Sequence, residues 1–120
     1  MKDASEHAHQ ATLIAWFDKE YPEIGKRLLA IPNGGLRNKT VAMKLKLEGV
    51  RPGVPDIFLP VPNWGFCGLF IEMKRLKGNP SPEQKDWIEF LNSQGYHAEV
   101  ANGCEKAKAI IKDYLTGYLK

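Results

Sequence analysis

The chain has 120 residues, 43% of them hydrophobic and 26% charged, with a net charge of +3. This composition excludes a disordered chain, and the length suits a single domain, which we assign to residues 1–120. There is no apolar run of the roughly 20 residues that a membrane span needs, and the polar, acid-containing N-terminus differs from a signal peptide. We therefore expect a cytoplasmic protein without a membrane partner.

The first half of the chain predicts two helices with a short strand between them. Apolar residues recur at helical spacing over residues 5–19, and this helix ends before Pro22 because the residue preceding a proline avoids helical geometry. Residues 28–31 form a short apolar run that favours a strand. After an Asn-Gly-Gly break, residues 39–47 predict a second helix, which Gly49 closes.

The middle of the chain predicts two strands joined by a hairpin-length loop. A Pro-Gly-Val-Pro turn precedes the short apolar strand at residues 57–59. Residues 60–68 contain two prolines and two glycines, which is typical of a loop, and residues 69–74 predict the next strand.

The last third predicts a helix, a strand and a helix. Ser81 as N-cap, Pro82 in the first turn and Gln84 in a capping box start a helix that runs to about residue 94. A strand at residues 97–101 and a helix at residues 106–115 follow. The order α-β-α-β-β-α-β-α indicates an α/β fold with a central mixed sheet flanked by helices.

Asp56 is the first candidate for chemistry. It follows a rigid turn and opens an apolar strand, where solvent and a ligand can reach its carboxylate. The alternative is an aspartate that caps its own turn, which is common before strands.

Glu72 and Lys74 lie two positions apart in the strand at residues 69–74, so their side chains share one face with Phe70. One interpretation is an ion pair on a solvated edge. The other interpretation is a buried Glu72, because three apolar residues precede it in the strand that we expect at the centre of the sheet. A buried charge requires a partner or a metal.

The two carboxylates predict a metal site. Asp56 and Glu72 are 16 residues apart across a hairpin-length loop, so adjacent strands bring them together. Two carboxylates repel each other unless a cation lies between them, and Mg²⁺ prefers such oxygen ligands. With Lys74 beside them to assist at a phosphate, these groups form a minimal site for phosphodiester hydrolysis.

Basic residues gather in two places. Five lie between residues 37 and 51 against one acid, and two more follow Lys74; they are Arg37, Lys39, Lys44, Lys46, Arg51, Arg75 and Lys77. Such clusters suit a DNA backbone, although a solvated lysine-rich helix face is an equal alternative.

The spacing of Asp56 from Glu72-Met73-Lys74 matches the PD-(D/E)xK nuclease signature, which is loose by itself. The surrounding segments are more specific: residues 31–35 (IPNGG), 53–60 (GVPDIFLP), 68–74 (GLFIEMK) and 81–84 (SPEQ) occur in that order. From about residue 6 to about residue 111 the chain closely resembles the virus-type replication-repair nuclease domain, VRR-NUC, in its small stand-alone phage or bacterial form.

This resemblance implies a restriction-endonuclease-like fold and DNA cleavage that depends on Mg²⁺ or Mn²⁺. By resemblance, Asp56, Glu72 and the backbone carbonyl of Met73 are metal ligands, and Lys74 is the catalytic lysine. Stand-alone members are similar to Holliday-junction resolvases, which implies a homodimer, a branched DNA substrate and a role in DNA repair.

Two further positions, Glu6 and Gln84, follow from the resemblance, and a third, Asn33, follows from the Asn-Gly-Gly turn; each has an alternative. The family carries a glutamate on its first helix, and Glu6 matches it better than Glu20, which lies at the frayed end. Gln84 matches a family glutamine, but it already has a capping-box role, and we expect one side chain not to serve both easily. Asn33 contacts DNA or a metal-bound water, or it simply forms a tight turn.

The sequence thus predicts a metal-dependent endonuclease for branched DNA such as Holliday junctions. A nuclease for linear or flap DNA remains an alternative, as does a non-catalytic DNA-binding or assembly module.

Overall fold

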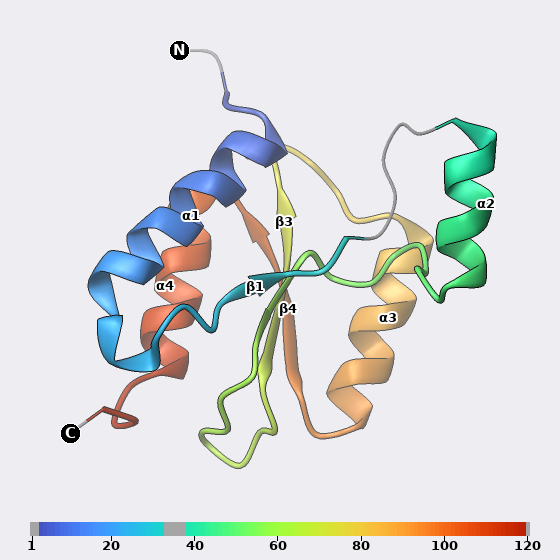
Figure 1. Ribbon diagram of the computed structural model, residues 1–120. Coiled ribbons are helices and arrows are strands. Elements are labelled where there is room, and N and C mark those ends of the chain that lie inside the picture. Colours follow the sequence, from blue (N-terminus) through green and yellow to red (C-terminus); the bar gives the residue numbers. More distant parts are fainter. Residues whose placement is uncertain (1–2, 33–37, 120) are drawn as a thin grey trace.

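The computed structural model describes residues 3–32 and 38–119 (Figure 1). The predicted order of helices and strands is confirmed, with one added 3-10 helix, η1, after the first helix. The elements are α1 (Glu6–Glu20), η1 (Pro22–Ile24), β1 (Leu29–Ala30), α2 (Lys39–Leu47), β2 (Ile57–Leu59), β3 (Leu69–Lys74), α3 (Pro82–Ser93), β4 (His97–Asn102) and α4 (Cys104–Tyr114).

A four-stranded mixed sheet forms the centre, in the order β1-β2-β3-β4. The pairs β1–β2 and β2–β3 are antiparallel, and β3–β4 is parallel. Figure 1 shows α1 and α4 together on one side of this sheet and α3 on the other. Because helices cover both faces, β3 has no solvated side: its first five residues are all buried.

The two faces of β3 belong to two apolar cores, as the predicted alternation requires. One core combines the odd positions of β3 with side chains of α1 and α4, including Leu13, Phe17, Leu69, Ile71, Met73 and Ile111. The other holds Phe70, Leu91 and Ala98 beneath α3, where the rings of Phe58 and Phe70 stack with centroids 4.3 Å apart. Glu72 has the same parity as Phe70 and therefore lies on the α3 face.

Three helices begin at side-chain caps that are local in sequence. Ser5 accepts from the Ala8 amide, Asn38 from the Val41 amide and Ser81 from the Gln84 amide. The last helix starts two residues earlier than predicted, at Cys104, whose amide donates to His9 Nδ1 at 3.0 Å. This cap comes from α1, so no local pattern announces it.

Two features concern exposure. In residues 3–32 and 38–119, no helix has both the length and the apolar character for crossing a bilayer. Figure 1 shows α2 away from the sheet, and α2 contains no buried residue.

Candidate active site

Asp56 and Glu72 meet at the point where β2 begins and β3 ends. The pairing of Ile57 with Ile71 aligns the two strands, and Asp56 Oδ2 accepts a hydrogen bond of 2.9 Å from the Met73 amide. The Asp56 carboxylate is therefore fixed on the backbone of β3, next to Glu72. Asp56 therefore does more than cap its own turn, because its carboxylate binds the neighbouring strand.

Glu72 is a buried carboxylate, with 1% of its surface exposed. Its Oε2 accepts from Gln84 Nε2 at 3.2 Å and lies 3.9 Å from Lys74 Nζ. Its Oε1 is also buried, and it accepts no hydrogen bond from the described residues. The interpretation of Glu72 and Lys74 as an ion pair on a solvated edge is therefore wrong.

The electrostatics of Glu72 reflect this position. Burial raises the pKa of Glu72 most, the neighbouring Asp56 carboxylate raises it further, and Lys74 opposes both, so that the pKa reaches about 9. Without a cation, the protonated form of Glu72 is favoured at neutral pH. A bound cation would allow both carboxylates to be charged together.

Lys74 joins Glu6 to this group. Lys74 Nζ lies 3.9 Å from Glu6 Oε2 as well as 3.9 Å from Glu72 Oε2. The rival position, Glu20, is the last residue of the same helix, roughly 20 Å farther along its axis. Of the two glutamates, only Glu6 is near the carboxylate pair.

Gln84 serves both of the roles that we expected one side chain not to combine. Its Oε1 accepts from the Ser81 amide at 2.7 Å, which completes the capping box, and its Nε2 donates to Glu72 Oε2 at 3.2 Å. The expectation was wrong because a primary amide carries its acceptor and its donors on different atoms. The first turn of α3 thereby holds Glu72 in place.

The carbonyl of Met73 faces the Asp56 side of β3. Along a strand, the N–H and C=O of one residue point to the same side, and successive residues alternate. The Met73 amide points to Asp56, while the Lys74 carbonyl accepts from Gly103 on the β4 side. Extending the Ile57–Ile71 register by two residues brings Pro55 opposite Met73, and a proline has no N–H to offer that carbonyl.

These donors fit a small divalent cation. Within residues 3–32 and 38–119, no group of three His, Cys, Asp or Glu side chains forms a metal cage. Two carboxylates and a backbone carbonyl are nevertheless hard oxygen ligands, and a Mg²⁺ site typically keeps several water molecules. The unpartnered Glu72 Oε1 and the raised pKa of Glu72 both favour a cation here.

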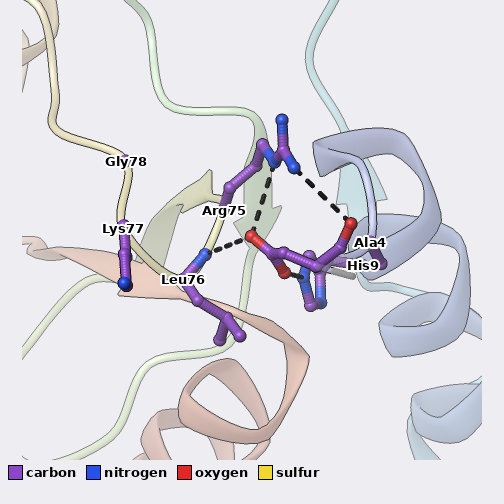
Figure 2. A pocket seen from close by; sticks show the side chains of 7 residues that line it. Ala4, His9, Arg75, Leu76, Lys77 and Gly78 are labelled. Carbon is purple, nitrogen blue, oxygen red and sulfur yellow. Dashed lines mark hydrogen bonds and ion pairs between the residues drawn. The ribbon is translucent and has the colours of Figure 1, made fainter. Parts of the chain in front are cut away.

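A hydrogen-bonded latch lies beside the end of β3 (Figure 2). Asp3 Oδ2 accepts from the Leu76 amide at 2.9 Å and from Arg75 Nε at 3.4 Å. Asp3 Oδ1 accepts from His9 Nε2 at 3.0 Å, while His9 Nδ1 accepts from Cys104. The bond from His9 is the main cause that lowers the pKa of Asp3. The latch ties the segment before α1 to the residues that follow Lys74.

Sequence reasoning missed this latch. Asp3 is 72 and 73 residues from Arg75 and Leu76, so no spacing signals the contact. Two hollows flank the site: one of about 760 Å³ includes Asp3, His9 and Arg75, and another of about 850 Å³ runs along α1. The second reaches from Glu6 to Asp18 and includes Asp56.

The predicted basic residues lie in two regions. Lys39, Lys44 and Lys46 are exposed on α2, and Arg51 follows it, donating to the Lys46 carbonyl at 3.2 Å. Arg75 is held by Asp3, and Lys77 lines the hollow of Figure 2. The predictions for Asn33 and Arg37 lie outside the described residues.

Comparison with known proteins supplies the family. The VRR-NUC domain model matches residues 4–105. A solved structure described as a VRR_NUC domain protein superposes with a TM-score of 0.84 at 27% identity, covering 97% of this chain and 92% of that one. Another, described as a VRR_NUC domain, has a TM-score of 0.56 at 18% identity, covers 92% of this chain and 99% of its own, and supports the fold alone.

No curated protein matches the sequence. The family model nevertheless spans most of the chain, and its boundaries enclose Glu6, Asp56, Glu72, Lys74 and Gln84. The chain therefore belongs to the VRR-NUC family, which makes it a nuclease domain that interacts with DNA.

Proposed function

We propose that this protein is an endonuclease that hydrolyses DNA phosphodiester bonds with the help of Mg²⁺ or Mn²⁺. One observation carries the proposal: the buried Glu72 carboxylate has an unpartnered oxygen, next to Asp56 and 3.9 Å from the Lys74 amine. A carboxylate pair without a cation is unfavourable in such a place. The family makes a phosphodiester the bond to be cut.

Asp56, Glu72 and the carbonyl of Met73 are the groups that would hold the cation. When bound, the cation supplies positive charge to the phosphate and lowers the pKa of water. The Lys74 amine lies beside the carboxylates, where it orients the attacking water or stabilises charge on the phosphate.

Two neighbours prepare these groups. Gln84 donates to Glu72 Oε2 and fixes the rotamer of that carboxylate, so that Oε1 stays free. Glu6, at 3.9 Å from Lys74 Nζ, holds the amine near the end of β3. Both are positioning residues in this mechanism.

The exposed cations supply contacts to the DNA backbone with little base specificity. We assign this role to Lys39, Lys44, Lys46, Arg51, Arg75 and Lys77, and to Arg37 and Asn33 from the sequence. Arg75 is already oriented by Asp3, which lowers the entropy that it loses on binding a phosphate.

We further propose branched DNA, such as a Holliday junction, as the substrate, and a homodimer as the active form. The described residues of one chain, 3–32 and 38–119, form one such site, whereas resolving a four-way junction requires two cuts, which a twofold pair of sites provides. Linear or flap DNA is the alternative substrate. A non-catalytic binding module is less consistent with a site in which all three charged groups, Asp56, Glu72 and Lys74, are present and adjacent.

The test is cleavage of four-way, flap and linear DNA with Mg²⁺, with Mn²⁺ and with a chelator. We expect Asp56→Ala and Lys74→Ala to abolish cleavage while the proteins fold and still bind DNA in Ca²⁺. Asp113→Ala, which removes an exposed acid on α4, is the matched control and should cleave normally. Cleavage retained by purified Asp56→Ala would remove the assignment.

A further inference from the structure

The short helix α2 carries two large apolar side chains that are mostly exposed to solvent. Met43 is 64% exposed and Leu47 is 83% exposed, and they lie one helical turn apart. The helix has nine residues and buries none of them, whereas isolated helices shorter than about 12 residues are marginal in water. Exposed apolar side chains on such an element indicate a surface that a partner covers.

The charges on α2 describe that partner. At about 100° per residue, Lys39 and Lys46 lie on one side of the Met43–Leu47 strip and Lys44 on the other. In the part of the chain that the structure describes, these lysines have no carboxylate within ion-pair distance. The exposed face is therefore an apolar strip with a cationic border.

A second copy of the chain is a poor occupant of this face. A twofold contact of α2 on α2 would bring three lysines of each copy together, with one acid per copy, Glu48, at the helix end. DNA fits both parts of the face. Phosphates match the lysines, and bases that are unstacked at a branch or kink offer apolar faces to Met43 and Leu47.

We propose that α2 is a wedge-like docking surface for DNA whose bases are unstacked, as at a branch point. The inference rests on the proposed nuclease function and extends it, because it gives a physical reason for selecting branched DNA. In regular duplex DNA the base faces are covered by stacking, so that linear DNA gains the lysine contacts without the apolar ones.

The connection from α2 to the active site is short and anchored. The Val50 amide donates to the Leu45 carbonyl at 2.9 Å, which closes the helix end. At Gly53 the backbone passes so near Glu83 of α3 that a Cβ would lie 2.7 Å from its carbonyl carbon. Asp56 follows Leu47 by nine positions, a stretch of chain that spans at most about 30 Å. Since one base pair rises about 3.4 Å, cleavage should fall within about nine base pairs of the unstacked step.

Binding measurements in Ca²⁺ test the proposal without cleavage. We expect the double variant Met43→Ser, Leu47→Ser to weaken binding to a four-way junction about tenfold and binding to a linear duplex less than about twofold. The variant Phe90→Ser changes another exposed apolar residue, 53% exposed on α3, and should bind both DNAs as the unchanged protein does.

The lysines provide a second, independent measurement. Replacing Lys39, Lys44 and Lys46 by Gln should weaken binding to both DNAs. It should also make the negative slope of log K against log salt concentration shallower by about 2 to 3, because three phosphate contacts are lost. The double apolar variant should leave that slope unchanged.

Three outcomes would overturn the proposal. The first is an equal loss of junction and duplex binding in the double apolar variant, and the second is no loss of either. The third is a smaller molecular mass of that variant than of the unchanged protein in sedimentation, because α2 would then be an interface between protein chains. Failure of the nuclease proposal would look different. The protein would then bind the junction through α2 but cut none of the DNAs with Mg²⁺ or Mn²⁺.

Discussion

Glu72→Gln should make the metal-free protein more stable while removing its activity. The substitution keeps the shape of the side chain and an acceptor for Gln84, but it removes a carboxylate from a site with 1% exposure. Burial and the nearby Asp56 carboxylate make the charged form of Glu72 unfavourable, and Gln carries no charge.

The size of the effect follows from the pKa of Glu72, which rises from 4.5 to about 9. A carboxyl with a raised folded-state pKa contributes full stability below its unfolded pKa, and this stability is lost as the pH rises towards the folded value. Each pH unit in this window is worth about 1.4 kcal/mol, so at pH 7 keeping Glu72 protonated in the folded state, while it is ionised in the unfolded chain, costs the apo-protein about 3 kcal/mol.

Thermal unfolding in a chelator measures this difference. At pH 4.5 the protein and its Glu72→Gln variant should melt at nearly the same temperature. At pH 7 the variant should melt about 10 °C higher, and the gap should widen up to about pH 9. Adding Mn²⁺ at pH 7 should raise the melting temperature of the unchanged protein and leave the variant unaffected, because the variant lacks the second carboxylate.

Two results would refute this reasoning. If Glu72→Gln had a lower melting temperature than the unchanged protein at pH 7, the carboxyl group of Glu72 would stabilise the folded protein rather than destabilise it. If the gap were the same at pH 4.5 and at pH 8, its cause would be packing and not charge.

Two further substitutions test how the site is held. His9→Ala should destabilise the protein by about 1 kcal/mol in urea unfolding, as the loss of a helix cap does, whereas His9→Asn, which restores an acceptor near Nδ1, should recover part of it. Equal losses in both variants would contradict the capping role. Gly53→Ala should cost more than about 2 kcal/mol, because φ is +88° and its Cβ would clash with Glu83. Gly49→Ala, with φ at +98° and open space around it, should cost only about 1 kcal/mol, and urea midpoints that matched would show that the close approach is unimportant.

Local signals were sufficient for most of the fold. The capping box at Ser81 and the alternation of residues 69–74 gave the start of α3 and the two faces of β3, because both patterns are complete within a few residues. The start of α4 and the helix η1 were missed. The cap of α4 comes from His9, 95 residues away, and such a contact has no local pattern.

The candidate site divides in the same way. The burial of Glu72 and its meeting with Asp56 followed from the apolar run and the hairpin-length loop. The bond from the Met73 amide to Asp56 and the latch at Asp3 depend on tertiary placement, and the sequence did not predict them. Gln84 was misjudged because the two ends of its amide were treated as one group.

The double duty of Gln84 changes how a substitution there should be interpreted. In most capping boxes glutamate replaces glutamine without penalty, and a scan of helix preferences would score the exchange as silent. Here Gln84→Glu would keep α3 intact and add a third negative group beside Glu72. Thermal unfolding in a chelator at low pH would therefore not detect the substitution, because the added carboxyl group is protonated there. The substitution should instead change which cations the site binds, so helix stability is the wrong assay for this position.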